Sequence, residues 1–506
     1  MRRFDVDIFD LIRPQKNQMT NSFHEVNFED TIINEESGKG KLKVKFWCKI
    51  KSFFNKLWQT PESRVVIFLL LSRIFFIIFT HYGMDFDFYL EIVKRVLTGE
   101  RLYVDIQSTH MPLVDLLYIA MYVICPWKEN IYALRVFLKF PFVLCDIGIT
   151  IAIMKIIENE FIRTNETGKV FTEKQTKKID RTKLGMGYLL AFSLPLIVQT
   201  AGGRYDSLMI FCFTMVILCL QKNNWFGVAF FAALGSSAKY IGIIFLPFVI
   251  FWMKKDDFLP FILGLLLGFL PIFPFLFTIP TEFVDAIFLR GSHIAYGFSI
   301  WHAVFIIWNG FNMKYVDGIE STYDSSGEPI FIQKSYIPMF IIIYLTIFVW
   351  FLFKNSQIIR TQSLSTMPLQ KLVLLVFIPL FIFALSFKAI NIQVLAWFTP
   401  YIALRKKKGL FFEYAILTFI HGFALIIFEA YNLATFLELS QLAASTDSPL
   451  YHLIVKPALI ITQVVPQVVW VSIIFITILW FFIRTTIELI TSSKELITNE
   501  YKQYSA

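Results

Sequence analysis

Two carboxylates, one residue apart, follow the first long apolar stretch of the sequence. They are Asp85 and Asp87, near the start of a segment of residues 83–112 that also contains His110. An ionisable side chain next to a bilayer is unfavourable and usually has a function. One carboxylate could accept the proton of a sugar hydroxyl as that hydroxyl attacks, while the other orients a substrate or a metal ion. The structural alternative is a pair that caps the amphipathic helix expected over residues 88–98.

A third acid lies between two later apolar stretches, in the short turn of residues 203–206. This acid is Asp206, and Arg204 lies two residues before it. The two side chains could simply form an ion pair with each other. Alternatively, Asp206 faces Asp85 and Asp87 across one pocket, which makes all three acids candidates for catalysis. The spacing leaves both interpretations open.

Basic residues near the same predicted face are candidates for binding a phosphate group. Lys239 separates two apolar stretches, and Arg290 and His293 belong to a long loop of residues 280–335. A lysine at a membrane boundary usually extends its ammonium to water, and an arginine in a loop is usually solvated. The functional alternative is a clamp on a phosphate. The candidates for phosphate binding are Lys239, Arg204 and Arg290, and those for substrate binding are His110, Gln393 and His293.

The composition indicates a membrane protein. The chain has 506 residues, of which 56% are hydrophobic and 17% are aromatic. A soluble protein of this size would expose too much of that apolar surface. The net charge of +9 would suit a nucleic-acid-binding protein, but the lysines and arginines gather at the ends of apolar stretches, as in the cytoplasmic loops of membrane proteins. We therefore expect an all-α, polytopic membrane protein whose partners include membrane lipids and no nucleic acid.

The distribution of basic residues orients the predicted helices. The loop after the apolar stretch of residues 133–156 is rich in lysine and arginine, so it should be cytoplasmic. The apolar run of residues 113–127 is shorter than the ~20 residues that a span needs. Counting it as a span would place the basic loop outside, so we interpret it as a re-entrant or surface helix of the first external loop. About twelve spans result, with both termini in the cytoplasm. The expected spans are residues 64–82, 133–156, 184–200, 207–221, 224–237, 239–253, 259–279, 336–354, 369–387, 391–404, 409–429 and 459–483.

This topology places the candidate residues at or near the external face. Polar residues scattered at random would populate both faces, so the clustering indicates a water-accessible site on that side. The expected regions are a basic cytoplasmic tail (1–60), a membrane core (61–404) with external loops at 83–132, 201–206 and 280–335, C-terminal membrane helices (405–484) and a second cytoplasmic tail (485–506).

One ionisable residue, Asp146, lies inside a predicted span. Such a residue is a candidate for either a functional or a structural role. We expect a structural role for Asp146, with Lys139, one or two turns earlier, as its ion-pair partner.

Several short motifs occur in order between residues 64 and 404. They are Asp85-Phe86-Asp87-Phe88, Leu97-Thr98-Gly99 with Tyr103, Ser108-Thr109-His110-Met111-Pro112-Leu113, Lys139-Phe140-Pro141 with Asp146, Gly203-Arg204-Tyr205-Asp206-Ser207, Ala238-Lys239-Tyr240 with Leu246-Pro247, and Asn391-Ile392-Gln393-Val394 with Trp397 and Pro400. In this series the chain resembles the membrane-embedded GT-C glycosyltransferases, which use polyprenyl- or dolichyl-phosphate sugars. It is similar to the catalytic subunit of glycosylphosphatidylinositol mannosyltransferase I and to mannosyltransferases that depend on polyprenyl-phosphate-mannose.

The resemblance implies a reaction and roles for the candidate residues. A sugar, most simply mannose, would pass from a polyprenyl- or dolichyl-phosphate donor to a hydroxyl of a glycan, glycolipid or protein acceptor, with inversion at the anomeric carbon. Asp85 or Asp87 would be the base and Asp206 the acid of the second external loop, with a groove for the lipid phosphate between the loops. No cofactor is required, because lysine and arginine alone can balance a leaving phosphate, but a divalent cation, magnesium or manganese, could bind at Asp85 and Asp87.

The expected location is the membrane of the endoplasmic reticulum or the plasma membrane, with the site on the lumenal or extracytoplasmic face. The alternative function is a transporter or flippase for a lipid or a solute. That class requires polar residues through the depth of several spans and broken helices at the midplane.

Overall fold

The computed structural model describes most of the expected membrane core. The described residues are 60–79, 84–106, 108, 110–164, 172–292, 296–297, 301, 330–361, 364, 367–387, 389–390, 394–404, 476, 479–480, 483–484 and 487. All of them belong to one compact unit, Leu57–Ala506. The expected tails at 1–60 and 485–506 lie almost entirely outside the described residues, as does the expected span at 409–429.

Helices account for most of the described chain. Its first half contains α2 (Pro61–Phe79), α3 (Met84–Leu97), α4 (Pro112–Ile124), α5 (Ile131–Thr164), α6 (Glu173–Ala191), α7 (Leu194–Ala201), α8 (Asp206–Gln221) and α9 (Trp225–Ala238). The second half contains η1 (Tyr240–Ile243), α10 (Leu246–Val249), η2 (Ile250–Trp252), η3 (Lys255–Asp257), α11 (Phe258–Gly268), α12 (Phe273–Thr278), α13 (Pro280–Ser292), α16 (Ile330–Thr361), α17 (Leu369–Ser386), α18 (Val394–Trp397) and α19 (Thr399–Leu404). Two short strands, β1 (Tyr296–Gly297) and β2 (Ala389–Ile390), pair in parallel. The expected all-α fold class is confirmed for this part of the chain.

Three helices of the described chain are long and apolar enough to cross a bilayer. They are the Ile131–Arg163 part of α5, the Ser335–Ser356 part of α16 and all of α17. The pair formed by α6 and α7 is a further candidate, and it bends by 47° at a short break. This pattern fits an all-α membrane protein.

These helices do not support the count of about twelve spans. The expected spans at 207–221 and 224–237 are α8 and α9, which have 16 and 14 residues. The expected span at 239–253 is divided among η1, α10 and η2, and that at 259–279 is divided between α11 and α12. Hydropathy reports how apolar a stretch is, but it does not show where the helix breaks. The count of twelve therefore stays a prediction.

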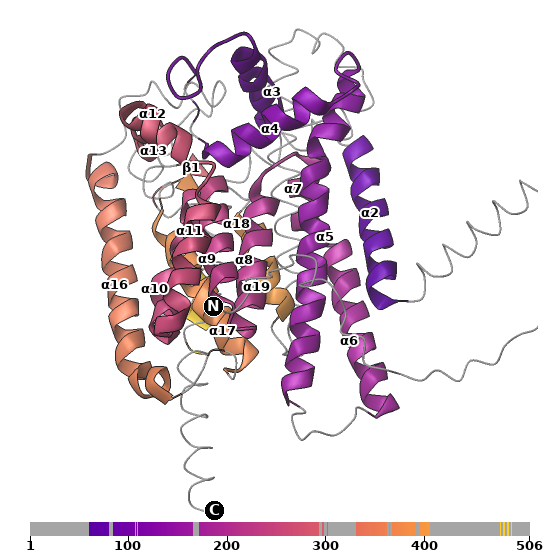
Figure 1. Cartoon of the computed structure of the whole chain (residues 1–506), viewed down its shortest axis with the longest axis vertical. Coiled ribbons are helices and arrows are strands. Elements are labelled where there is room, and N and C mark those ends of the chain that lie inside the picture. The colour runs from indigo at the N-terminus through magenta and orange to yellow at the C-terminus, as the bar shows by residue number, and fades with distance from the viewer. Residues whose placement is uncertain are drawn as a thin grey trace, which may run out of the picture. The chain divides into compact units, whose positions relative to one another are not determined.

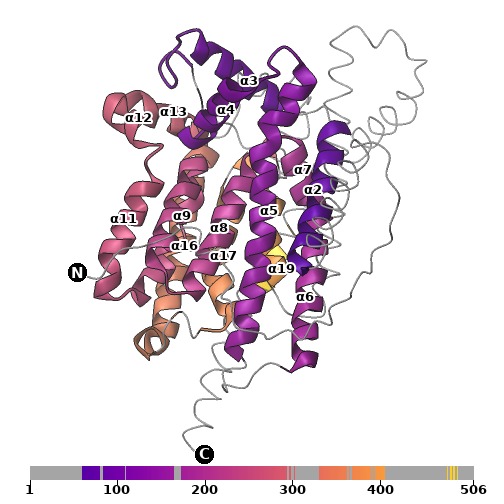
Figure 2. The ribbon, with the colours of Figure 1, turned by 45° about the vertical axis from the view of Figure 1, so that its right-hand side comes forward.

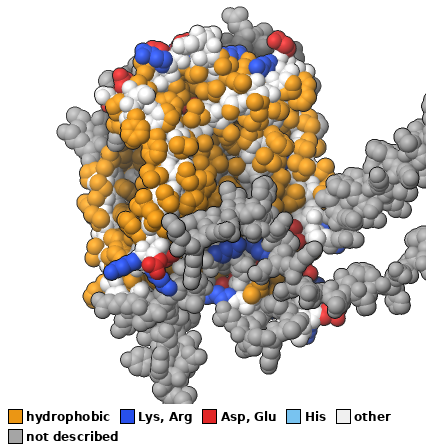
Figure 3. All heavy atoms as spheres, viewed as in Figure 1, with side chains coloured by type: hydrophobic (Ala, Val, Ile, Leu, Met, Phe, Trp, Pro, Cys, Tyr) orange, Lys and Arg blue, Asp and Glu red, His pale blue; other side chains and the backbone are white. Residues whose placement is uncertain are grey.

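An apolar surface covers the sides of the long helices. Figure 3 shows hydrophobic side chains over most of one face, with acidic and basic side chains gathered toward its two ends. On α16, Phe353, Ile342 and Val349 are 78%, 64% and 61% exposed. So large an apolar patch is unfavourable in water, whereas lipid tails solvate it. The surface therefore agrees with a membrane location.

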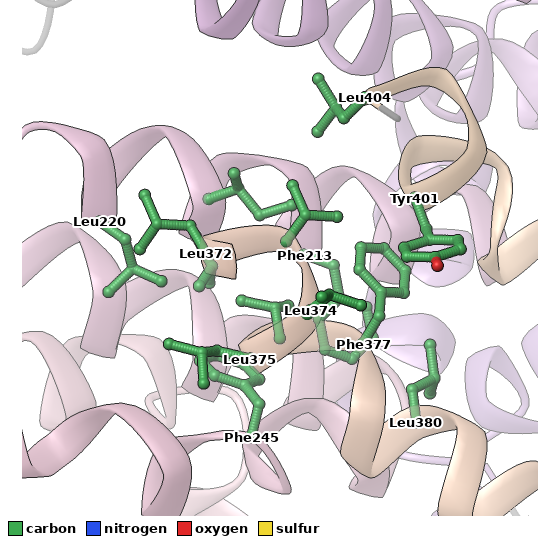
Figure 4. Close-up of a cluster of buried hydrophobic side chains, with 14 of the residues drawn as sticks. Phe213, Leu220, Phe245, Leu372, Leu374, Leu375, Phe377, Leu380, Tyr401 and Leu404 are labelled. Carbon is green, nitrogen blue, oxygen red and sulfur yellow. The ribbon is translucent and has the colours of Figure 1, made fainter. Parts of the chain in front are cut away.

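The buried helix α17 lies at the centre of the core, where residues 371–386 are all buried. The ring of Phe377 lies 6.2 Å from that of Phe213 on α8 and 5.7 Å from that of Tyr401 on α19, measured between centroids. Figure 4 shows this packing, with labelled side chains of α17 and of the elements around it. The core therefore holds α8 and α19 in place, and these helices lead to the candidate site.

Gly264 and Gly268 let α11 approach α9 closely. An added Cβ would lie 2.3 Å from the carbonyl oxygen of Phe226 at the first position and 2.5 Å from that of Phe230 at the second. Small residues four apart are typical of helices that pack tightly within membranes. The Ser237 hydroxyl of α9 also donates a hydrogen bond of 2.9 Å to the Gly268 carbonyl. The contact fixes the C-terminal end of α9.

Four helices lie together at one end of the long helices, which we call the α3–α4 end. Figures 1 and 2 show α3, α4, α12 and α13 there in both views. Helix α4 has 13 residues. Its length of about 20 Å is less than the ~30 Å of the hydrocarbon core, so it cannot cross the bilayer. Helix α3 confirms the helix expected over residues 88–98 but begins earlier, at Met84.

Candidate functional site

A buried ion pair joins two helix ends at the α3–α4 end. The Lys239 ammonium lies 2.7 Å from Oδ1 of Asp206, whose side chain is fully buried. Asp206 is the first residue of α8, and Lys239 directly follows the last residue of α9. A helix dipole favours a negative charge at the N-terminus and a positive charge at the C-terminus. A turn of residues 222–224 joins α8 to α9, so the N-terminus of α8 lies beside the C-terminus of α9. The dipole of α8 therefore stabilises the negative charge of Asp206, and that of α9 stabilises the positive charge of Lys239.

Two aromatic rings lie next to the Lys239 ammonium. Its nitrogen is 4.3 Å from the centre of the Trp397 ring and 5.3 Å from the centre of the Tyr205 ring. The indole N–H of Trp397 also donates a hydrogen bond of 2.7 Å to Oδ1 of Asp206. An ammonium has three N–H donors, and within the described residues the hydrogen bond of Lys239 goes to Asp206. In that part of the chain, no further hydrogen bond uses the other two N–H donors of Lys239.

Tyr118 of α4 holds the turn that precedes Asp206. Its hydroxyl donates a hydrogen bond to the carbonyl oxygen of Gly203. Gly203 has a φ of +68°, in the left-handed region that favours glycine. The Tyr118 ring stacks on the ring of Tyr89 on α3, with centroids 4.5 Å apart. Helix α4 therefore connects α3 to the turn from which α8 begins.

The ring of His110 contacts both predicted external loops. Its centroid lies 4.8 Å from that of Tyr89, 5.7 Å from that of Phe88 and 5.5 Å from that of Tyr205. Tyr205 directly precedes Asp206 in the sequence. The structure therefore brings His110, a predicted substrate-binding residue, to the segment that carries the buried ion pair.

Behind His110, a buried carboxyl group anchors its loop. Asp115 of α4 accepts a 2.7 Å hydrogen bond from the Ser108 hydroxyl, whose oxygen accepts one of 3.2 Å from the His110 N–H. The Tyr103 hydroxyl donates to the His110 carbonyl at 2.7 Å and lies 3.4 Å from Oδ2 of Asp115. Burial raises the pKa of Asp115 to about 7, against the opposing effect of the two hydroxyl groups. This loop is therefore held from α4.

A second buried ion pair corrects the expectation for Asp146. Its Oδ2 lies 2.5 Å from Nε of Arg73 on α2 and accepts a hydrogen bond of 2.6 Å from the Thr200 hydroxyl on α7. The Arg73 guanidinium also donates to the Ala191 carbonyl at 2.8 Å. Because α2 packs along α5, Arg73 rather than the expected Lys139 provides the ion pair. The network connects α2, α5 and α7 below the turn that carries Asp206.

The described part of the site combines a buried acid–cation pair with several aromatic rings. No protein-family model matches the sequence, and no curated protein matches it. The chemistry is therefore argued from the side chains themselves. An ammonium held by a carboxylate can bind a phosphate, and flat aromatic faces can pack against the apolar faces of a sugar ring.

The predicted site residues fall into three groups. Those described with their side chains are Asp206, Lys239, His110 and Arg204. Those described in the backbone alone are Asp85, Asp87 and Arg290, the two acids in the first turn of α3 and the arginine near the end of α13. Those outside the described residues are His293 and Gln393. Arg204 is 9% exposed and belongs to the same turn as Asp206.

The expected divalent cation stays a prediction. Among the described residues, no group of three or more His, Cys, Asp and Glu side chains could hold a metal ion. The side chains of Asp85 and Asp87, which were expected to hold magnesium or manganese, are outside that part of the structure.

Sequence reasoning gave no role to several residues that organise this end of the protein. Asp115 lies inside the apolar run of residues 113–127, and Arg73 lies inside the first predicted span. An ionisable residue in an apolar stretch is a candidate for a specific role, so the sequence did contain a signal for these two. Tyr118 had no such signal, and Trp397 was named in a motif but given no role. With 17% aromatic residues in the chain, spacing does not show which rings also form hydrogen bonds.

Proposed function

We propose that this chain is an inverting membrane glycosyltransferase that moves a sugar, mannose by resemblance, from a polyprenyl- or dolichyl-phosphate donor to an acceptor hydroxyl. One observation carries the proposal. The Lys239–Asp206 pair lies beside Trp397 and Tyr205 and is connected to the first predicted loop through His110. Sugar transfer from a lipid phosphate needs a cation near the leaving phosphate and a base near the acceptor, both at one membrane surface.

Lys239 is the proposed contact for the donor phosphate. Asp206 and the two rings hold its ammonium at the α3–α4 end, so the lysine need not extend to water. In this proposal Asp206 acts by orienting Lys239, because its Oδ1 already accepts hydrogen bonds from Lys239 and Trp397. Arg204 and Arg290 would add positive charge near the same phosphate.

The proposed step is a displacement at the anomeric carbon. Asp85 or Asp87 accepts the proton of the acceptor hydroxyl. The hydroxyl oxygen forms a bond to the anomeric carbon on the face opposite the phosphate, and the bond from that carbon to the phosphate oxygen breaks. Both electrons of the broken bond leave with the lipid phosphate, whose charge Lys239 offsets. A magnesium or manganese ion on the two acids would supply further positive charge. The proposed sugar and acceptor contacts are His110, His293 and Gln393.

The proposed topology follows from the positive-inside pattern. The chain would have about twelve spans and both termini in the cytoplasm. The site would face the lumen of the endoplasmic reticulum or the cell exterior, and the acceptor would be a glycan, a glycolipid or a protein. The positions of the basic loops along the sequence support this orientation.

Reconstitution of the full chain tests the proposal. Purified protein in liposomes is supplied with polyprenyl-phosphate-mannose labelled in the sugar and with a mixture of glycolipid acceptors. We expect label in an acceptor with the wild-type chain, and none with Asp85→Asn together with Asp87→Asn. Lys239→Met should lower the transfer rate, whereas Lys177→Met, on the exposed side of α6, should leave it unchanged.

Two outcomes would contradict the proposal. Label that crosses the bilayer while still attached to its lipid indicates the transporter or flippase function instead. Equal transfer by the wild-type chain and by the double variant at Asp85 and Asp87 excludes these acids as the base.

A further inference from the structure

The network behind His110 contains a buried acid that the proposed reaction does not use. Asp115 is 1% exposed and lies on α4, outside the membrane-spanning helices. Its one short hydrogen bond comes from Ser108, at 2.7 Å. Within the described residues, Oδ1 of Asp115 has no hydrogen-bond partner. An ionised carboxylate with so little compensation is unfavourable in an apolar site, so the neutral acid is favoured.

The hydroxyl of Tyr103 gives an ionised Asp115 little stabilisation. A phenol has one hydrogen to donate, and the shorter contact, 2.7 Å to the His110 carbonyl, takes it. The contact of 3.4 Å from this hydroxyl to Oδ2 of Asp115 is long, so it opposes the neutral form of the acid only weakly. Tyr103 has a φ of +68°, which is uncommon for a bulky residue and persists only where its surroundings hold it.

Both backbone polar groups of His110 are held by this network. Its N–H donates to the Ser108 oxygen, and its carbonyl accepts from the Tyr103 hydroxyl. The His110 ring contacts the Tyr205 ring, which in turn lies next to the Lys239 ammonium. A change at Asp115 therefore reaches the candidate site through a short series of direct contacts.

We propose that Asp115 is a positioning residue that acts in its neutral form: it holds His110 against Tyr205, and its ionisation releases the segment of residues 101–112. The proposal concerns the order of this segment in the protein without substrate. Its success or failure is therefore independent of the glycosyltransferase proposal.

Other ionisable groups lie on the elements that pack against α4, and their effects must be separated from that of Asp115. Its own segment supplies the His110 imidazole and the Tyr103 phenol, and burial raises the pKa of that phenol well above its usual value. Helices α3, α5 and α9 pack against α4. They supply Tyr89, Lys139 and, directly after α9, Lys239. A free histidine titrates near the same pH as Asp115, so His110 needs its own variant.

Hydrogen exchange of the full chain in lipid nanodiscs provides the test. Peptides that cover residues 101–112 are followed between about pH 5.5 and about pH 8.5, across the range in which such a group titrates. Rates are divided by those of an unstructured peptide of the same sequence, because amide exchange itself depends on pH. We expect wild-type protection to fall by up to about tenfold per pH unit as the pH rises toward 7 and to level off above it, since the contribution of a group with a raised pKa is lost below that pKa and one unit of pKa corresponds to a factor of ten.

Four variants separate the effect of the Asp115 carboxyl group from that of other ionisable groups. Asp115→Asn, which copies the neutral acid in shape and polarity, should keep the segment protected at every pH. Asp115→Ala should leave it unprotected at every pH. His110→Gln should keep the wild-type pH dependence. Glu91→Gln, an exposed acid on α3, should behave as the wild type.

Three results would overturn the proposal. Protection that does not change with pH in the wild-type chain excludes a role for ionisation. A pH dependence that disappears in His110→Gln assigns it to the histidine. Wild-type protection in Asp115→Ala shows that the acid does not hold the segment.

Discussion

Trp397 and Asp206 are 191 positions apart in the sequence, yet the indole nitrogen of the first lies 2.7 Å from Oδ1 of the second. The same indole presents its ring to the Lys239 ammonium, at 4.3 Å. One side chain therefore contacts both members of the buried ion pair, through its N–H and through its face. The two contacts are chemically different, so substitutions can separate them.

Replacing Trp397 with Phe removes the N–H donor and keeps an aromatic face near Lys239. A hydrogen bond to a charged group contributes about 1.5–3 kcal/mol. If that loss appears in the transition state, sugar transfer falls by about tenfold to about a hundredfold. The measurement is the transfer rate in liposomes, with Trp127→Phe, at a ring that is 55% exposed, as the control. Full activity of the Trp397 variant would contradict a role for the N–H.

The Asp206–Lys239 pair should show strong coupling in a double-mutant cycle. Asp206→Asn or Lys239→Met alone leaves one buried charge without its partner, which costs about 3–5 kcal/mol. The double variant should be less destabilised than the sum of the two single variants. Thermal unfolding of the purified chain in detergent measures the three changes.

An exposed pair provides the control for this cycle. Lys177 and Glu173 on α6 are 67% and 81% exposed, and exposed helix pairs contribute about 0.3–0.5 kcal/mol. Coupling at Asp206 and Lys239 that is no larger than this value would mean that the buried pair adds little to stability.

Asp115 should make stability depend on pH. Its pKa is about 7 in the folded chain and about 3.9 in an unfolded one. The folded chain thus holds the proton more tightly, and the stabilising contribution is fully present below pH ~4 and is lost as the pH rises through ~7. The unfolding temperature should fall as the pH rises from about 4 to about 7, and Asp115→Asn should remove that part of the fall. Equal pH dependence in the wild type and in Asp115→Asn, with Glu91→Gln for comparison, would disprove the assignment.

Leucine at Gly264 or Gly268 should separate α11 from α9. The new side chain would overlap backbone atoms of α9 that an added Cβ already approaches within 2.3 Å and 2.5 Å. Overpacking of this kind costs typically about 1–3 kcal/mol and sometimes more. The yield of folded protein and its unfolding temperature should both decrease. Gly185→Leu is the matched control, because an added Cβ at Gly185 meets no atom within 4 Å, and it should leave both quantities unchanged.

Apolar stretches and their flanking charges predicted the helical class well. The amphipathic pattern of residues 88–98 also predicted α3, on which Tyr89 and Val93 are buried. These features are local, because they depend on residues within a few helical turns of one another. The prediction that residues 113–127 do not cross the membrane is likewise local, because it depends on length.

Two further features could not be predicted from local pattern. The partner of Asp146 is Arg73, on a helix whose packing against α5 is a tertiary property. Trp397 reaches Asp206 because α17, β2 and α18 return the chain to the α3–α4 end. Neither contact can be predicted from the spacing of residues in the sequence. In a membrane protein rich in aromatic residues, spacing does not show which ring contacts a buried acid.

Helix α4 sets the alignment of two loops by the number of residues between its anchors. Asp115 and Tyr118 are three positions apart, so they lie on the same side of the helix; one holds the segment of His110 and the other holds the turn at Gly203. A residue inserted between them would rotate Tyr118 by about 100° and shift it by about 1.5 Å relative to Asp115. One loop would then lose its anchor while the other kept it. The number of residues between Asp115 and Tyr118 is therefore fixed by the need to hold both loops. A one-residue insertion that a surface helix would normally tolerate is not tolerated between these two positions.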